Sequence, residues 1–404
     1  MRVSTYMLYQ SGERNIVDRS RELLATQSQL ASGKRIDSPA DDPLGAADAT
    51  SVRASLAQFE QFKDNQGHAR YLLNLGESAL ARFIDAVQDV QEKLVAAGNG
   101  AYGDDERRMI AQDLEGVLGR MVGLANSSDG AGGYLFAGAR ENAAPFAQTG
   151  NAVAFRGDEI LQRLEISRDR FQQVKFSGDA LFMKMRPGNG TFTTAAAATN
   201  TGSASIDAGT VQNPTLLTGL PYTIDFSVAG GTTTYRVVRQ DGSPSPPVVA
   251  SGTYTSPTSI EFDGIRVSIT GAPADGDRFD VAPSGFRSVF DTLAQAIEVL
   301  RQPAGDAAAR ARFNTALAGA QASIGQALDH LLLKRAAIGS ALAELDAYER
   351  LNDDRTQQYQ GRLSLVEDLD YAKAVSELAR RQATFDAAIR SYSSISRLSL
   401  FDFL

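Results

Sequence analysis

The 404-residue sequence has no cysteine and only two histidines, His68 and His330. Without cysteine, the chain can form no disulfide bond, no thiolate nucleophile and no cysteine-ligated metal site. Each histidine lies within a long helical pattern and has no second ligand at metal-binding spacing, which favours a packing or surface role over ligation. We therefore expect no catalytic residue, no cofactor and no metal, and we class the protein as a non-enzyme.

The sequence is also short of basic charge and of long hydrophobic runs. Its 40 lysines and arginines are outnumbered by 48 acidic residues, which leaves a formal net charge of −8. Nucleic acid and anionic membrane surfaces are bound by basic patches, so neither is expected as a partner. No segment approaches the run of about 18 apolar residues that a membrane-spanning helix needs.

A conventional secretory signal is missing from residues 1–20. This stretch has no apolar core and carries charges such as Glu13, Arg14 and Asp18. A signal peptide needs an uninterrupted apolar segment. If the protein leaves the cell, we expect a route that removes no conventional signal.

What the sequence does contain is a matching seven-residue repeat at its two ends. Apolar residues separated by seven positions predict long helices that pack lengthwise against other helices. We expect helices over residues 3–34 and 370–398 to pair and to form an assembly interface that neighbouring copies complete. The candidate interface residues are Tyr9, Ile16, Leu23, Leu30, Tyr371, Leu378, Phe385, Ile389 and Tyr392.

Two much longer helical segments lie inside these ends. Residues 43–97 and 306–366 both carry heptad columns of apolar residues, with Gln66 and Asn352 as polar exceptions. They are expected to run antiparallel as a rod. Shorter helices are predicted over residues 104–125 and 286–301.

The middle of the chain changes to a period of two, which is typical of strands. Short strands are predicted at 134–136, 152–155 and 164–166. Residues 191–201 are expected to be a linker. Beyond them, alternating segments at 222–228, 234–238, 259–262 and 265–269, separated by glycine-containing turns, predict an antiparallel β domain.

The predicted fold class is α+β, mainly α: a nested antiparallel stalk of long helices from both termini, with β-rich domains inserted in the middle. Three domains are expected. Residues 1–42 and 367–404 form a terminal helical assembly domain. Residues 43–186 and 286–366 form the rod, with short hairpins in 134–182, and residues 187–285 form the inserted β domain.

Three features invite a chemical interpretation. The glycines at 130–133 lack the Lys-Ser/Thr of a phosphate loop, which favours a turn. The paired acids Asp41 and Asp42 precede Pro43, which favours helix capping, with Ser38 and Asp41 as a capping box. The acid-rich set in the β domain is read as turn residues or at best a weak cation site, and an enzyme carried there is the alternative from another class. That set is Asp263, Asp275, Asp277 and Asp280.

Two motifs resemble the flagellin superfamily. One runs from Ser32-Gly33-Lys34-Arg35-Ile36 to Asp41-Asp42-Pro43-Leu44-Gly45, and its candidate family residues are Gly33, Arg35, Asp41, Asp42 and Pro43. The other is the terminal helix, which ends in Leu398-Ser399-Leu400-Phe401-Asp402-Phe403-Leu404. The opening residues 1–7, the Asp-Asp-Pro sequence and Gly133-Tyr134-Leu135-Phe136 are similar to a junction member of the superfamily rather than to flagellin itself.

The resemblance implies a structural adapter at the junction between hook and filament, secreted through the flagellar type III export channel without a cleaved signal. Its implied partners are neighbouring copies of itself, the first hook-associated junction protein, flagellin and a flagellar export chaperone. The alternative within the same superfamily is flagellin, the bulk subunit of the filament.

Overall fold

The computed structural model describes residues 5–140 and 142–401. Residues 3 and 4 of the expected first helix, the rest of the opening motif at residues 1–4, and the closing Asp402, Phe403 and Leu404 lie outside the described residues. The chain divides into two compact units. We call residues 66–346 the central unit, and the described residues on either side of it the terminal unit.

The helices follow the sequence prediction closely. Two of them have the expected bounds, and the others differ by a few residues. The expected helix at 286–301 starts only at Val289, where the Ser288 hydroxyl accepts a 2.9 Å hydrogen bond from the N–H of Asp291 and caps it. The helices are α1 (Thr5–Ser32), α2 (Pro43–Ala97), α3 (Asp104–Ala125), α4 (Val289–Arg301), α5 (Ala307–Glu367) and α6 (Tyr371–Phe401).

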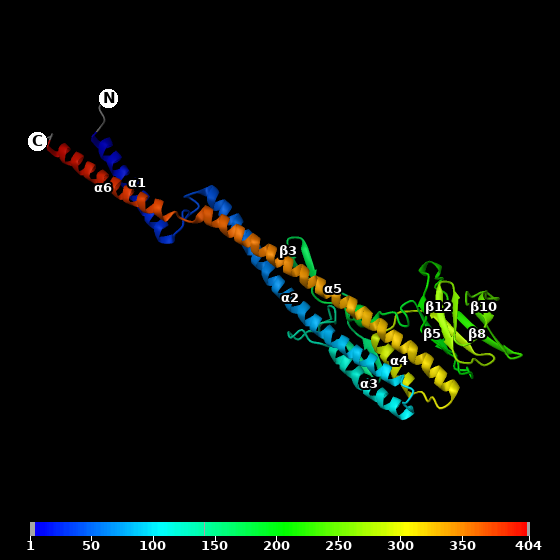
Figure 1. Cartoon of the computed structure of the whole chain (residues 1–404). Coiled ribbons are helices and arrows are strands. Elements are labelled where there is room, and N and C mark those ends of the chain that lie inside the picture. Colours follow the sequence, from blue (N-terminus) through cyan, green and yellow to red (C-terminus); the bar gives the residue numbers. More distant parts are fainter. Residues whose placement is uncertain (1–4, 141, 402–404) are drawn as a thin grey trace. The chain divides into compact units, whose positions relative to one another are not determined.

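Within the central unit, α2 and α5 are antiparallel. Arg335 of α5 bonds Glu77 of α2 at 2.8 Å, and Gln321 donates to the Leu94 carbonyl at 3.0 Å, so residue numbers fall along one helix as they rise along the other. The heptad columns of both helices are buried, and α3 and α4 cover the end of the pair (Figure 1). In this unit, the facing sides of the two long helices therefore form an internal hydrophobic core.

Both polar exceptions in the heptad columns are buried and hydrogen-bonded. Gln66 donates to the Ile166 carbonyl at 2.7 Å within the central unit. Asn352 donates to the Phe59 carbonyl at 3.0 Å within the terminal unit. A buried amide needs such a partner, because an unsatisfied polar group inside a protein is costly.

Phenylalanine side chains join the helices of the central unit to the short strand that starts at Phe146. Phe182, on the single π-helical turn Asp179–Met183, is 1% exposed. Its ring centroid lies 4.4 Å from that of Phe83 on α2 and 6.2 Å from that of Phe290 on α4. Phe136 and Phe146 complete the cluster at 5.4 and 5.6 Å. Residues far apart in sequence thus share one aromatic core.

A buried ion pair holds the glycine-rich turn at 130–133. The Lys175 ammonium lies 3.0 Å from Asp129, and both side chains are almost completely buried. Asp129 also accepts hydrogen bonds from the N–H groups of Ala131 and Gly133, each at 2.9 Å. The segment is a turn, as expected. The strand expected at 134–136 is wrong, since only Tyr134 forms an isolated bridge, with Ser128.

This ion pair predicts how stability changes in acid. Burial disfavours the charged form of Asp129, but Lys175 and the two N–H groups outweigh it and hold the pKa of Asp129 below its ordinary value. A lowered folded-state pKa gives stability that is present above about pH 4 and is lost as pH falls through the folded value. We expect Lys175→Met to reduce the free energy of unfolding by about 3 kcal/mol at neutral pH, because Asp129 is left buried without its cationic partner.

Urea denaturation between neutral pH and pH 3 checks this prediction. The unchanged chain should lose stability on acidification, and Lys175→Met should lose less, since protonation now relieves its unpaired carboxylate. Lys184→Met is the matched control, because the Lys184 side chain is 46% exposed and its partner Glu159 is 68% exposed, so this ion pair is screened by water. Equal losses in Lys175→Met and Lys184→Met would contradict the prediction.

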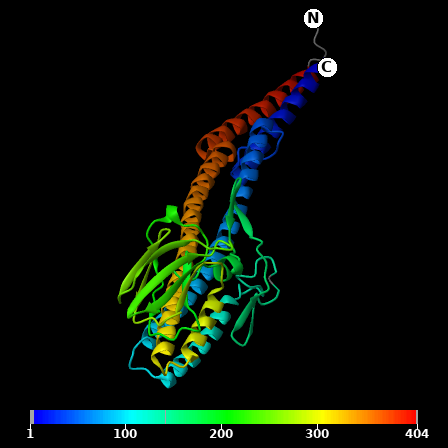
Figure 2. The ribbon, with the colours of Figure 1, turned by 90° about the vertical axis from the view of Figure 1, so that its right-hand side faces the viewer.

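The inserted domain is two antiparallel sheets around one apolar core (Figures 1 and 2). The first sheet has the order β10-β9-β8-β13-β5, and the second the order β11-β12-β6, with β7 also paired to β12. Ile224 and Phe279 of the first sheet share the core with Ile260 and Val267 of the second. The strands are β5 (Phe192–Ala196), β6 (Ser205–Ile206), β7 (Thr210–Val211), β8 (Tyr222–Ala229), β9 (Thr232–Arg239), β10 (Val248–Thr253), β11 (Thr258–Phe262), β12 (Ile265–Thr270) and β13 (Arg278–Pro283).

Two hairpin turns show why the sheets take this register. Gly230 and Gly231, both with positive φ, join β8 to β9, and Asp263-Gly264 joins β11 to β12 in the same way. Two central residues with positive φ make the turn that suits the twist of a hairpin.

The expectation of a linker at 191–201 is wrong, since β5 lies there and pairs with β13. Outside this domain, two hairpins are formed by β1 (Phe146–Thr149) with β2 (Ala152–Phe155), and by β3 (Arg163–Ser167) with β4 (Arg170–Gln173).

Candidate functional site

The terminal helices α1 and α6 lie side by side and antiparallel (Figures 1 and 2). Near one end of the pair, the rings of Tyr9 and Tyr392 meet edge to face at 6.3 Å. Gly12 lies so close to the same ring that a Cβ there would be 2.6 Å from Tyr392. At the other end, Gly33 lies against the hydroxyl of Tyr371. The same alignment of α1 against α6 therefore holds along the whole pair.

The candidate interface residues line this pair only thinly. Among the described side chains of α1 and α6, only Thr26 and Ala374 are buried. Tyr371 and Ile389 are 56% and 42% exposed, and each of the other candidates is half-buried. The half-buried candidates are Tyr9, Ile16, Leu23, Leu30, Leu378, Phe385 and Tyr392.

The thin seam has a cause in the sequence. A two-helix seam needs two apolar columns on each helix. On α1 the second column is small or polar: Gly12, Arg19, Thr26 and Gly33. On α6 it is Ala374, Arg381 and Ala388. Within the pair, the second columns therefore offer few side chains that could cover the large apolar residues.

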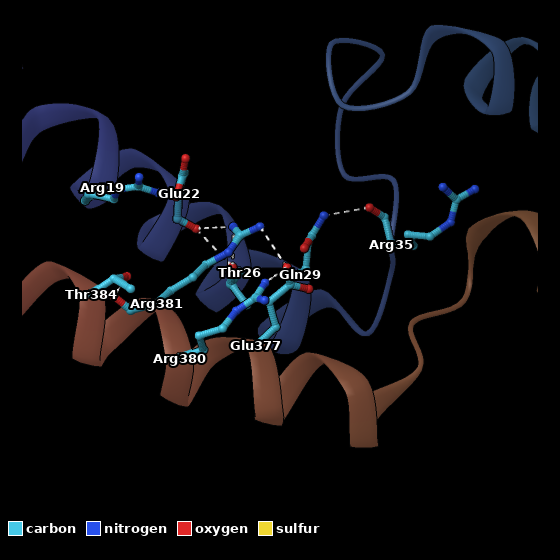
Figure 3. Close-up of polar contacts among 9 residues, drawn as sticks. All are labelled: Arg19, Glu22, Thr26, Gln29, Arg35, Glu377, Arg380, Arg381 and Thr384. Carbon is cyan, nitrogen blue, oxygen red and sulfur yellow. Dashed lines mark hydrogen bonds and ion pairs between the residues drawn. The ribbon is translucent and has the colours of Figure 1, made fainter. Parts of the chain in front are cut away.

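A polar layer crosses the seam at the middle of the pair (Figure 3). Arg381 of α6 reaches over to α1, where one terminal nitrogen donates to the Glu22 carbonyl at 2.6 Å and to the Thr26 hydroxyl at 2.7 Å. Its other terminal nitrogen bonds Glu377 at 3.3 Å. The Thr26 hydroxyl in turn donates to the Glu22 carbonyl at 3.0 Å. This arrangement joins the two helices at a single level.

Our sequence reasoning missed Thr26 and Arg381. The seam of each terminal helix was predicted from one apolar column, and both of these residues lie in the second column. The signal was present in the second column of α6, where Arg381 has an alanine seven residues before it and another seven residues after it. A long charged residue at a seam position is a common sign of a specific register.

The helices break beside the terminal pair at two places, between α1 and α2 and between α5 and α6. These two segments are hydrogen-bonded to each other within the terminal unit. Gly33 ends α1 with a φ of 71° and donates to the Gln29 carbonyl at 2.9 Å, as expected of a C-cap. Its own carbonyl accepts from the N–H of Leu369 at 3.0 Å. Arg35 donates to the Glu367 carbonyl from its backbone and to the Val366 carbonyl from its side chain, at 2.6 and 2.7 Å. These contacts of Gly33 and Arg35 with residues 366–369, which we call the joint, lie at the end of α5, before α6 starts.

The acids at the start of α2 have different roles. Asp42 accepts from the N–H of Gly45 at 2.9 Å and so caps the helix ahead of Pro43. The same N–H and the neighbouring Arg35, at 3.1 Å, hold the pKa of Asp42 below its ordinary value. Asp41 instead closes a turn by accepting from the backbone and hydroxyl of Ser38. The expected capping box at Ser38 is therefore wrong, since residues 38–41 are not helical.

A further carboxylate at the joint was not predicted. Glu367 is 5% exposed and forms ion pairs with Lys34, at 3.6 Å, and with Arg53. Lys34 and Asp368 also form an isolated antiparallel bridge. These contacts connect the end of α5 with α2 and with the segment between α1 and α2.

The acids of the β domain that the sequence singled out form hydrogen bonds within turns or lie within a strand. Asp277 accepts from the backbone of Thr201, Gly202 and Ala274, and Asp275 from that of Val228, so both are turn residues. Asp263 bonds the hydroxyl of Tyr222 at 2.8 Å, and Asp280 lies within β13.

The histidines are isolated. His330 lies 3.1 Å from the Ala180 carbonyl, and burial lowers its pKa, while His68 is exposed. Over residues 5–140 and 142–401, no three His, Cys, Asp or Glu side chains are grouped so as to hold a metal ion. Over the same ranges, no helix has both the length and the apolar character needed to cross a membrane.

Comparison with known proteins identifies relatives over the whole chain. A family model described as the bacterial flagellin N-terminal helical region matches residues 3–141. Flagellar hook-associated protein 3 of Escherichia coli is 26% identical over 402 residues, which are 99% of this chain and 99% of that protein. A crystal structure of Xanthomonas campestris FlgL is 31% identical, with a TM-score of 0.70, and covers 77% of this chain and 99% of that one.

Flagellins match a smaller part of the chain. Flagellin of Listeria monocytogenes is 23% identical over 129 residues, which are 32% of this chain and 45% of that protein. The resemblance to the flagellin superfamily is thus confirmed, together with the mainly α fold class and its β insertion. The chain belongs to the flagellar hook-associated protein 3 family and is a structural protein of the bacterial flagellum.

Proposed function

We propose that this chain is the adapter between the hook and the filament, and that it works through the terminal pair α1–α6 rather than through a catalytic site. It assembles as a short ring with neighbouring copies of itself. One side of the ring binds the first hook-associated junction protein, and the other binds flagellin. No cofactor, nucleic acid or membrane takes part.

The observation that carries this proposal is the half-buried seam. Large apolar side chains such as Leu23 and Phe385 remain partly exposed, whereas the columns of the central unit, such as Leu80 and Val87, are completely buried. Apolar surface left in water is unfavourable by about 25 cal/mol per Å². Further helices from neighbouring copies would remove that exposure.

The terminal unit also has exposed apolar residues outside the seam. Leu44 and Leu365 are 86% and 87% exposed, near the start of α2 and the end of α5. Val17 and Leu24 on α1 and Val375 on α6 are also exposed. A neighbouring copy that covered these side chains would remove their apolar surface from water.

The export route is part of the proposal. A chain without cysteine can pass unfolded through a narrow channel without disulfide bonds to break. We propose secretion by the flagellar type III route, with an export chaperone holding the C-terminal helix. The division into a terminal domain, a rod and a β domain, at the boundaries stated above, is also our proposal.

A seeded-growth experiment tests the adapter against the flagellin alternative. We expect the purified chain, offered fragments of flagellar filament as seeds, to add no long filament in electron micrographs. Flagellin under the same conditions is the control and should grow. The chain should also retain flagellin and the first hook-associated junction protein in one pull-down, because an adapter has a separate surface for each. Long filaments made of this chain alone would refute the adapter role.

A further inference from the structure

The apolar seam of the terminal pair does not by itself define how the two helices align. Its large residues recur every seven positions on both helices, for example Ile16 and Leu23 on α1, or Leu378 and Phe385 on α6. Sliding one helix along the other by seven residues, about 10 Å, again places apolar residues opposite apolar residues. Several alignments are therefore nearly equivalent for this column.

The polar layer removes this equivalence. Arg381 meets Thr26, and the residues seven positions away from Thr26 are Arg19 and Gly33. A slip in one direction brings Arg381 opposite the like charge of Arg19. A slip in the other brings it opposite Gly33, which has no side-chain acceptor. Of the positions Arg19, Thr26 and Gly33, only Thr26, which Arg381 faces in the observed register, has a side-chain acceptor.

We propose that Arg381 and Thr26 select the register of α1 against α6. This inference rests on the proposed function, since the terminal pair is there the assembly module, and it names the residues that align that module. Arg381 is a positioning residue: it excludes the slipped alignments more than it stabilises the correct one. A buried or half-buried polar group that specifies register at little gain in stability is well documented in coiled coils.

The lack of cysteine makes the register directly measurable, because introduced cysteines are then the only thiols. The in-register reporter is Gly12→Cys with Tyr392→Cys, two positions in contact. The slipped reporters are Gly12→Cys with Phe385→Cys, and Arg19→Cys with Tyr392→Cys, each displaced by one heptad. Disulfide formation in the full-length chain under mild oxidation gives the ratio of in-register to slipped product.

In these backgrounds we expect Arg381→Met to lower that ratio about tenfold, since an apolar side chain fits each alignment while the lost guanidinium no longer penalises the wrong ones. Thr26→Val, which keeps the shape and removes the hydroxyl, should act in the same direction. Arg381→Lys should restore most of the ratio, because an ammonium can still donate to Thr26. The melting temperature of Arg381→Met should not fall, which separates register selection from ordinary stabilisation.

Arg380→Met is the matched control. Arg380 stands next to Arg381 and bonds the same Glu377, at 3.2 Å, but its side chain is 73% exposed. It should leave the ratio unchanged. Equal ratios in Arg381→Met, Arg380→Met and the unchanged chain would overturn the inference, as would a loss of register that Arg381→Lys does not repair.

Failure of this inference and failure of the proposed function give different results. If the ratio is independent of Arg381 but incorporation into flagella still requires the seam, the register inference falls and the adapter remains. If Arg381 controls the ratio but the chain grows long filaments by itself, the register inference stands and the adapter falls.

Discussion

Leu23→Asp and Phe385→Asp are each expected to abolish incorporation of the chain into flagella. Both side chains are half-buried in the α1–α6 seam, where we propose that neighbouring copies close over them. Enclosing a carboxylate there costs several kcal/mol, since a buried charge without a partner is strongly disfavoured. A strain that carries only the variant should be non-motile in soft agar. The purified variant should keep the far-ultraviolet circular dichroism of the long helices, whose core lies in the central unit.

Gln27→Asp is the control for this prediction. Gln27 lies on the same helix, is exposed, and gains the same carboxylate. It should remain motile. Loss of the whole helical signal in Leu23→Asp would mean that the seam is internal core. Normal motility of both seam variants would show that the terminal pair is not part of the assembly interface.

Phe182→Ala is expected to lower the free energy of unfolding by about 4 kcal/mol. Phe182 is completely buried and contacts rings from a hairpin, a loop and two helices, so its removal leaves a cavity that few neighbours can fill. Because native proteins are stable by only about 5–15 kcal/mol, such a loss is a large share of the total. The midpoint of a urea unfolding curve measures it.

Phe171→Ala provides the comparison on a nearby strand. Phe171 is 56% exposed, so the same truncation should change the free energy of unfolding by less than about 1 kcal/mol. A small loss in Phe182→Ala, similar to that of Phe171→Ala, would show that the aromatic cluster contributes little to holding the hairpins on the helices.

The long helices were the part of the fold most open to prediction. Their heptad columns extend over many turns, and breakers such as Gly33 and Pro43 mark their ends, so local information is sufficient. The strands were less accessible. After Phe192, β5 has only small and polar residues and looked like a linker, and the two-residue strands β6 and β7 carry no pattern of their own. Such strands form because a partner strand lies beside them. The intrinsic strand propensity of their own residues does not contain this information.

The residues of the candidate site also fall into a group that the sequence could predict and a group that it could not. Spacing identified Tyr9, Leu23 and Phe385 as seam residues, because a repeat of seven is visible along one helix. It could not identify Arg381 as the partner of Thr26, since that contact joins positions 355 residues apart. Asp42 was found as a helix cap because capping is local. Glu367 was missed because its cationic partners come from another part of the chain.

The sequence by itself determined which segments of this protein are helical and that both ends carry one-sided apolar seams. Those properties depend on neighbours within a few turns of the same element. The tertiary structure alone decided which residues face each other: the alignment of α1 on α6 at Arg381 and Thr26, the joint around Glu367, and the pairing of β5 with β13. A periodic pattern is unchanged by sliding one helix along another, so the choice among alignments depends on non-repeating contacts made only when the chain is folded.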